Sequence, residues 1–232
     1  FATSTPDYFV PGSGSLFQEK MGLDNIGVLD IRQGCSGFTY ALSVADKFIK
    51  TQTYKNILVI GAEVQTTQLD FDDEGRGTAV LFGDGAAACI LTSTKADKGI
   101  LSAHLHSDGR YIDDLGTVYP SSKYKDIITV ENVKNRQHHI HMNGREVFKH
   151  AVRRFPEEIL EGLEYNNLTL SDVALIIPHQ ANYRITQAVQ RQLNIGEDKV
   201  FSNIHKYGNT TAASIGIALT ETLEQDRIKD GD

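Results

Sequence analysis

The apolar positions of the chain gather in short runs that alternate with polar turns. Strands are predicted at 26–31, 56–63, 173–177 and 199–204. The second of these runs is strongly apolar, as is typical of strands buried inside a parallel sheet. The segment 77–92 predicts two strands bent at 83–85, where Gly-Asp-Gly interrupts the apolar pattern.

Other apolar positions recur with the spacing of a helix. Phe38, Leu42, Ala45 and Ile49 predict a helix of about four turns that begins at or just beyond residue 35. A helix from about residue 145 contains Pro156, which must kink it or start a second helix. Further helices are expected at 15–23, after Pro178 and at 211–228, with loops at 101–142 and 205–210. Strands and helices therefore alternate, which predicts an α/β fold with mainly parallel sheets.

Cys35, His179 and Asn209 occupy equivalent places in this pattern. Each follows an apolar strand and a polar or glycine-bearing turn, and each precedes a predicted helix. In α/β folds, ligands bind at the carboxyl ends of strands and at the N-termini of helices. We therefore consider a joint site made of these three residues.

Each of the three residues also has a purely structural explanation. A thiol near a helix N-terminus has a lowered pKa and suits a nucleophile, but taken alone Cys35 is better explained as a small residue at a crowded turn. His179 could donate or accept a proton, or simply bond to nearby backbone. Asn209 fits a helix N-cap, which would explain it alone. Their occurrence together makes a Cys/His/Asn site the hypothesis to test.

Composition narrows the class of protein. The 232 residues suffice for one large domain or two fused halves, and the net charge of −7 argues against general nucleic-acid binding. No run approaches the roughly 18 apolar residues of a membrane helix. Two cysteines, Cys35 and Cys89, make no disulfide framework and indicate a reducing cytoplasm. The first residue is not methionine and the chain stops in a turn-like stretch, so we expect a chain truncated at both ends.

Five motifs carry a resemblance to a known family. The chain contains, in this order, ATSTPDYFVP (2–11), DIRQGCSGF (30–38), RGTAVLFGDGAAA (76–88), IPHQANYRI (177–185) and YGNTTAAS (207–214). Together they closely resemble β-ketoacyl-acyl carrier protein synthase III, a condensing-enzyme family of the thiolase superfamily. The resemblance implies a thiolase-like α/β fold, with two pseudo-duplicated βαβαβαββ halves in a layered αβαβα arrangement. The halves would be residues 1–95, with the nucleophile, and 96–232, with His179 and Asn209.

The resemblance also implies a reaction. Cys35 would be acylated by an acyl-CoA, and malonyl-acyl carrier protein would then lose CO₂ and attack the acyl-cysteine. Decarboxylation needs donors aimed at the thioester carbonyl, and His179 and Asn209 can each supply an N–H. Acyl-CoA and malonyl-acyl carrier protein are then substrates, and no cofactor or metal is expected.

Further roles follow from the same resemblance. Arg76 aligns with an arginine that contacts CoA, and Phe9 with an aromatic residue that crosses the interface of a homodimer. Leu81 and Phe82 lie where the acyl tunnel is shaped, and Asn182 supports the site. Ordinary core packing is the alternative for Phe9, Leu81 and Phe82.

An acidic carrier protein requires a basic patch on this acidic enzyme. Lys149, Arg153, Arg184 and Arg191 are the candidates, and Arg184 and Arg191 lie seven residues apart on one predicted helix face. A solvated face with scattered charge is the alternative, above all for Arg153 and Arg191.

Several features point elsewhere or leave the substrate open. Arg32 and Gln33 are long and polar where the family usually has small residues, which leaves the acyl primer open. A related acyltransferase, a Cys/His/Asn hydrolase with His179 as base, or an idle scaffold remain alternatives. The GDGAAA segment imitates a dinucleotide motif but lacks a second βα unit. The histidines of HHIH (138–141) have no accompanying carboxylates or cysteines, so an exposed loop is favoured over a metal site.

Overall fold

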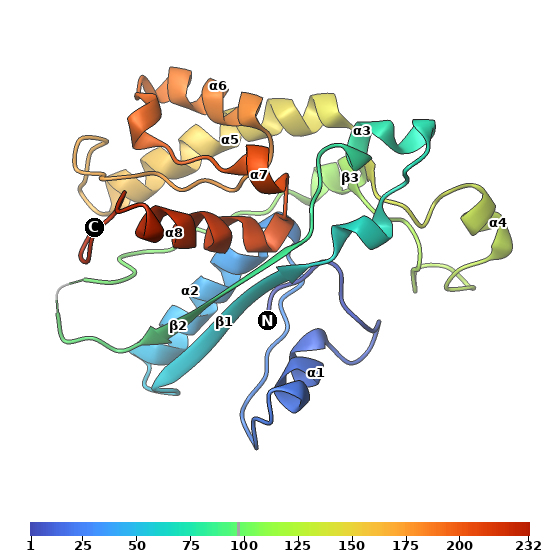
Figure 1. Ribbon diagram of the computed structural model, residues 1–232, viewed down its shortest axis with the longest axis horizontal. Helices are drawn as coiled ribbons and strands as arrows, with labels where there is room; N and C mark the ends of the chain where they lie inside the picture. The colour runs from blue at the N-terminus through green and yellow to red at the C-terminus, as the bar shows by residue number, and fades with distance from the viewer. Residues whose placement is uncertain (97) are drawn as a thin grey trace.

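The computed structural model describes residues 1–96 and 98–232 (Figure 1). The helices are α1 (Ser13–Lys20), α2 (Gly37–Lys50), α3 (Arg76–Ala79), α4 (Val130–Lys134), α5 (Gly144–Tyr165), α6 (Tyr183–Leu193), α7 (Ile204–Tyr207) and α8 (Ser214–Glu224). The strands are β1 (Asn56–Glu63), β2 (Gly85–Thr92), β3 (Leu115–Gly116) and β4 (His141–Met142). Residue 97, in the predicted second half, lies outside the described residues.

The longest strand ladder joins β1 and β2. The two strands are antiparallel, with Val59 opposite Cys89 and Gly61 opposite Ala87. The expectation of mainly parallel sheets is therefore wrong for this ladder, because the segment between the strands brings the chain back in the opposite direction. Parallel pairing occurs as isolated bridges: Ala2 with Ile31 and Gly61, Phe82 with Asn209, and Ile176 with Val200.

One face of this ladder packs against α2 and α8, which lie alongside it in Figure 1. Phe38 of α2 is 1% exposed and belongs to the same core cluster as Val59. A Cβ on Gly216 of α8 would lie 2.5 Å from the Cβ of Ala87, so only glycine allows this helix to approach β2 so closely. The last helix of the chain therefore packs on the strands of the predicted first half.

A second core cluster forms between α5 and α6, which run side by side in Figure 1. Ile185, Val189 and Leu193 recur every four residues along α6 and form one apolar stripe. They pack against Val152 and Phe155 of α5. This stripe leaves the opposite face of α6 in solvent, which is where its arginines lie.

Most predicted elements are confirmed, with differences in detail. The strand at 56–63 and the helix of about four turns after Cys35 both exist, as β1 and α2. The strand predicted at 77–82 is wrong, because Arg76–Ala79 form the short helix α3 and only Phe82 is bridged. The predicted loop at 205–210 begins with the last residues of α7.

The remaining differences concern strands and a proline. Within the described residues, 26–31, 173–177 and 199–204 each contribute a single bridged residue rather than a regular strand. Helix α5 continues through Pro156 as one helix of 22 residues, so the proline does not start a second helix. Among the described residues, no helix combines the length and apolar character needed to cross a membrane.

Candidate functional site

Cys35 lies in a 3-10 turn, η1 (Gly34–Ser36), that leads directly into α2. Gly34 enters this turn with a φ of +54°, in the left-handed region that favours glycine. Burial first, and then the negative charge of Glu63, raise the pKa of the Cys35 thiol to about 12. The expected lowering of this pKa by the helix start is therefore wrong here, because desolvation outweighs the backbone hydrogen bond that favours the thiolate.

His179 lies on the connection that precedes α6. Its Nδ1 is 2.6 Å from the Oγ of Ser214, the first residue of α8. Burial lowers the pKa of His179 to about 4, so the ring is neutral near pH 7 and carries a single proton. Within the described residues, no hydrogen bond occupies Nε2. That nitrogen is therefore the one available to a substrate.

The neighbouring Gln180 fixes the backbone of this connection. Its side chain is 2% exposed and fully hydrogen-bonded. Its Nε2 donates to the carbonyl oxygens of Pro178 (2.8 Å) and Phe201 (3.3 Å), and its Oε1 accepts from the Ser202 hydroxyl (3.1 Å) and the Asn203 N–H (3.0 Å). Because this buried amide is hydrogen-bonded through both its nitrogen and its oxygen, it restricts the backbone position of the neighbouring His179.

Asn209 is 7% exposed and caps no helix. Its Oδ1 accepts from the backbone N–H of Thr211 (2.9 Å), which is an Asx-type turn rather than an N-cap. The amide oxygen is thereby used within the loop, which leaves the Nδ2 amino group as the donor of this side chain. The capping alternative for Asn209 is therefore wrong, because the residue does not stand at the start of α8.

The buried carboxylate of Glu63 ties distant segments together at the end of β1. The residue is 2% exposed. It accepts hydrogen bonds from the hydroxyls of Thr3 (3.3 Å), Ser4 (2.8 Å) and Thr5 (2.9 Å), from Gln65 Nε2 (3.3 Å) and from the backbone N–H of Ala212 (3.4 Å). These donors stabilise the buried oxygen atoms and fix residues 3–5 and 212 around β1.

The 3-10 turn η6 (Thr211–Ala213) brings the three candidate residues together. It packs against η1, which contains Cys35, and against β1. It also lies between Asn209 and Ser214, the residue bonded to His179. Residues 209–214 therefore connect all three.

Comparison with known proteins identifies the family. Residues 29–109 match the family model 3-Oxoacyl-[acyl-carrier-protein (ACP)] synthase III, and residues 163–232 match the model of its C-terminal part. A β-ketoacyl-[acyl-carrier-protein] synthase III of Clostridioides difficile is 44% identical over 231 residues, covering 100% of this chain and 69% of that protein. The chain belongs to the synthase III family.

Solved structures of synthase III enzymes have the same fold. The 3-oxoacyl-[acyl-carrier-protein] synthase III of Aquifex aeolicus is 42% identical, with a TM-score of 0.89 over 100% of this chain and 69% of that one. The Thermus thermophilus enzyme is 36% identical, with a TM-score of 0.88 over the same shares of the two chains. These similarities confirm the predicted thiolase-like α/β fold class.

The other residues predicted from the synthase III motifs lie around this centre. Leu81 and Phe82 pair with Asn209 through the isolated parallel bridge. Arg76 is exposed at the first position of α3. Asn182 caps α6, because its Oδ1 accepts from the backbone N–H of Arg184 (2.9 Å).

Arg136, from a distant part of the chain, stabilises the segment that precedes Arg76. Arg136 makes ion pairs with Asp70 and Asp72 and holds the pKa of Asp70 at about 2. Asp70 itself is 6% exposed, so this pair fixes the chain just before the short 3-10 turn that leads into Arg76.

Phe9 and Arg32 share one small cavity. Both line a space of about 180 Å³, together with Pro6 and Ile31. Phe9 is 53% exposed, so it is not a core residue of this chain, and Arg32 and Gln33 are also exposed. The core-packing alternative for Phe9 is therefore wrong, and the unusual Arg32 lies beside the residue that the motif assigns to the acyl pocket.

The predicted docking residues lie on α5 and α6. Arg184 and Arg191 are both exposed on α6, and within the described residues neither forms an ion pair. Lys149 on α5 pairs with Glu146 (3.2 Å), and Arg153 pairs with Glu157 (2.9 Å). Arg184 and Arg191 therefore offer the least compensated positive charge of the four.

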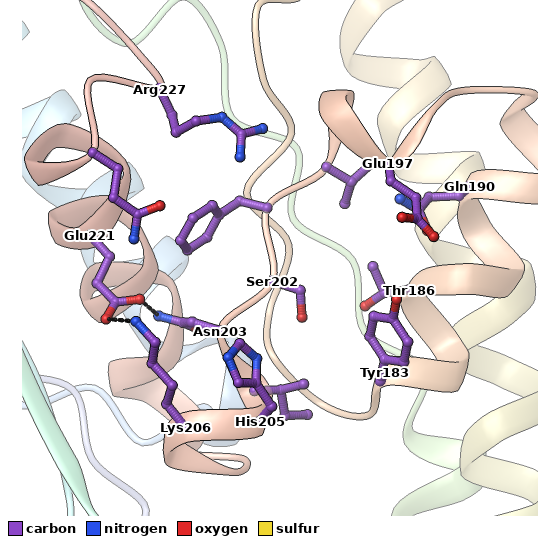
Figure 2. Close-up of a pocket in the computed structure, with 14 residues that line it drawn as sticks. Tyr183, Thr186, Gln190, Glu197, Ser202, Asn203, His205, Lys206, Glu221 and Arg227 are labelled. Atoms are coloured by element: carbon purple, nitrogen blue, oxygen red, sulfur yellow. Dashed lines mark hydrogen bonds and ion pairs between the residues drawn. The ribbon is translucent and has the colours of Figure 1, made fainter.

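Figure 2 shows a further cavity, of about 760 Å³, between α6 and α8. Tyr183 and Thr186 of α6 form one wall, and Glu221 of α8 lies opposite, where it bonds Lys206 (2.9 Å) and Asn203 (3.0 Å). Cys35, His179 and Asn209 are not among its lining residues. The cavity is therefore no part of the predicted catalytic centre.

Two histidine groups lie outside the centre, and the buried Nδ1 of His138 has no hydrogen-bond partner among the described residues. His106, Glu158 and Glu161 each place one ligand atom within 4.8 Å of the others, and His106 Nε2 bonds Glu161 at 2.8 Å. In the HHIH segment, His139 Nδ1 lies 3.3 Å from the Gln68 carbonyl oxygen and His141 Nε2 3.1 Å from that of Asp113.

Sequence reasoning did not single out three residues of the centre: Glu63, Gln180 and Ser214. Gln180 and Ser214 stand inside the motifs that carried the resemblance, but their types alone indicate no chemistry. Glu63 is a charged residue at the end of an apolar strand, which is the pattern that could have identified it.

Proposed function

We propose that this chain carries the condensing centre of a β-ketoacyl-acyl carrier protein synthase, with Cys35 as nucleophile and His179 and Asn209 as oxyanion donors. The observation that carries the proposal is the loop 209–214. It contains Asn209, packs against the turn of Cys35 and bonds His179 through Ser214. A chance association of three useful residues would not explain why one short loop contacts all of them.

The first step is transfer of the acyl group from CoA to Cys35. The sulfur of Cys35 attacks the thioester carbonyl, the new S–C bond forms, and the S–C bond to CoA breaks. The proton of the Cys35 thiol leaves with the CoA sulfur, so the exchange of one thioester for another balances. Because the thiol pKa is about 12, Cys35 rests as the protonated thiol and is not spontaneously reactive.

The second step is decarboxylation and condensation. The malonyl group of the carrier-bound substrate loses CO₂, and negative charge moves to its thioester oxygen. Asn209 Nδ2 and His179 Nε2–H are the donors that would stabilise this charge, and a neutral ring with a pKa of about 4 suits that role. The resulting carbanion attacks the acyl carbonyl on Cys35, so that a C–C bond forms and the C–S bond to Cys35 breaks. The leaving thiolate takes up a proton from solvent and restores the resting thiol.

We assign substrate binding from the family resemblance and from the exposed positive charges. Arg76 would contact the phosphates of CoA from its exposed place at the start of α3. Arg184, Arg191 and Lys149 would bind an acidic acyl carrier protein. Neither step needs an external oxidant or reductant, so acyl-CoA and malonyl-acyl carrier protein suffice as reactants.

Assembly and location complete the proposal. Phe9 is 53% exposed and is free to contact a second copy in a homodimer. Cys35 and Cys89 are both free thiols, in keeping with a reducing cytoplasm.

A cysteine hydrolase is the competing function, and the charges of the centre disfavour it. Such an enzyme needs a thiolate beside a histidine that accepts protons. Here the pKa of Cys35 is raised to about 12 and that of His179 is lowered to about 4, which favours the neutral pair. Neutral groups suit a donor role better than a base role.

Intact-mass analysis of the full-length protein separates the two functions. Incubation with a panel of acyl-CoAs should add one acyl group, in the Cys89→Ala control but not in Cys35→Ala. Addition of malonyl-acyl carrier protein should then remove the adduct as β-ketoacyl product. Release as free acid would establish hydrolysis instead, and no adduct at all would contradict both functions.

A further inference from the structure

Ser214 contacts the ring of His179 from a completely different part of the chain. It is the first residue of α8 and is 2% exposed. Its Oγ lies 2.6 Å from His179 Nδ1 and 3.3 Å from the backbone nitrogen of Gln180. The distance to Nδ1 is that of a strong hydrogen bond.

The partners of the hydroxyl decide which atom donates. The backbone N–H of Gln180 can only donate, so Ser214 Oγ accepts that bond. Among the described residues, the one other hydrogen-bond partner of Oγ is His179 Nδ1. A buried hydroxyl proton needs an acceptor, and Nδ1 is the acceptor within reach.

We propose that Ser214 is a positioning residue, whose hydroxyl donates to His179 Nδ1 and thereby keeps the single ring proton on Nε2. The bond also sets the plane of the ring, because Ser214 is fixed in α8 and its oxygen is held by Gln180. The inference rests on the proposed function, in which Nε2–H stabilises the developing negative charge. Ser214 touches neither substrate nor reacting atom and acts only through His179.

The burial of Ser214 and Gln180 makes this orientation persistent. Gln180 anchors the backbone of residues 178–180 with its four hydrogen bonds, and Ala213 beside Ser214 is 0% exposed. Loss of the Ser214 hydroxyl would leave Nδ1 without a donor and the Gln180 N–H without an acceptor. The ring could then carry its proton on either nitrogen or rotate away from the substrate.

The tautomer can be observed directly in the full-length protein. With ¹⁵N-labelled histidine, NMR correlation of ring nitrogens to ring carbon-bound protons distinguishes an Nδ1–H from an Nε2–H tautomer. We expect His179 in the wild-type protein to show Nε2–H. A wild-type spectrum with the proton on Nδ1 would overturn the proposal without any variant.

Variants test whether Ser214 causes that pattern. Ser214→Ala should give a mixed or reversed tautomer, and Ser214→Thr, which restores a hydroxyl, should move the pattern back toward wild type. Thr222→Ala is the matched control, because Thr222 lies on the same helix and is 0% exposed. Among the described residues its hydroxyl donates only to the Leu219 carbonyl oxygen (2.7 Å). An unchanged His179 pattern in Ser214→Ala would overturn the proposal.

Kinetics add a readout that a purely structural role would not move. Ser214→Ala should slow decarboxylation of malonyl-acyl carrier protein by about tenfold or more, below the loss of about 100-fold expected for removal of an oxyanion donor itself. Acylation of Cys35 by acyl-CoA should stay near its wild-type rate. Equal slowing of both steps would indicate a general packing defect and contradict the proposal.

These measurements also separate this inference from the proposed function. If His179→Ala decarboxylates malonyl-acyl carrier protein normally, the proposed function of His179 fails, whatever the tautomer. If His179→Ala is inactive while Ser214→Ala keeps both the tautomer and the rate, the function stands and the role of Ser214 fails.

Discussion

Phe82 and Asn209 face each other in a parallel bridge that joins two distant segments of the chain. The backbone N–H of Asn209 donates to the Leu81 carbonyl oxygen (2.7 Å), and the N–H of Gly83 donates to the Asn209 carbonyl oxygen (3.0 Å). The backbone of the predicted oxyanion donor is thus held by the segment predicted to shape the acyl tunnel. A substitution that displaces residues 81–83 should therefore displace Asn209 as well.

Gly83 is the sensitive point of this bridge. A Cβ there would lie 2.2 Å from the Tyr207 carbonyl oxygen, so Gly83→Ala must displace the loop that carries Asn209. We expect condensation to slow by about tenfold or more while the first acylation of Cys35 persists. Single-turnover mass analysis measures both steps. Gly109→Ala, where a Cβ meets nothing within 4 Å, is the control, and equal rates in both variants would refute the coupling.

Glu63 should govern the reactivity of Cys35. Its negative charge helps to raise the pKa of the thiol, so Glu63→Gln should lower that pKa and increase the thiolate fraction at pH 8. Alkylation of Cys35 by iodoacetamide should accelerate, by up to about tenfold for each unit of pKa lost. The rate is measured across pH 7 to 10. Glu74→Gln, at an exposed carboxylate, should leave it unchanged; a slower reaction in Glu63→Gln would contradict the electrostatic role.

His179 should make the fold sensitive to acid. Its pKa is lowered from 6.5 to about 4 by burial, so the unfolded chain binds a proton more readily than the folded one. Stability is then fully present above pH 6.5 and falls as the pH drops toward 4, by up to about 3 kcal/mol from this group.

Urea unfolding at pH 7.5, 5.5 and 4.5 measures this dependence. His179→Gln removes the titrating ring and should lose less free energy of unfolding over the same range. A variant whose loss matches that of the wild type would show that another group causes the acid sensitivity.

Charge reversal should separate the two substrates. Arg184→Glu replaces an exposed positive charge on α6 with a negative one, so an acidic carrier protein should bind less tightly. We expect the KM for malonyl-acyl carrier protein to rise about tenfold, more at low than at high salt, with the KM for acyl-CoA unchanged. Lys20→Glu on α1, which Figure 1 places far from α6, is the control. An equal rise for both substrates would rule out carrier docking at Arg184.

The sequence alone determined part of the local structure, and it determined the family. Apolar periodicity placed β1 at 56–63 and the helix after Cys35, because burial patterns within one element depend on nearby residues. The motifs identified the synthase III family. They also singled out Cys35, His179 and Asn209 as catalytic residues, and these roles stay a prediction.

Only the tertiary structure decided how these groups are tuned. The antiparallel pairing of β1 and β2, the Asx turn of Asn209 and the raised pKa of Cys35 all differ from expectations drawn from local sequence. The strand pairing and the thiol pKa depend on partners from far along the chain: Gly85–Thr92 for β1, and Glu63 with the surrounding core for Cys35. The hydrogen bond between Ser214 and His179 (2.6 Å) likewise forms only because the start of α8 packs against the centre.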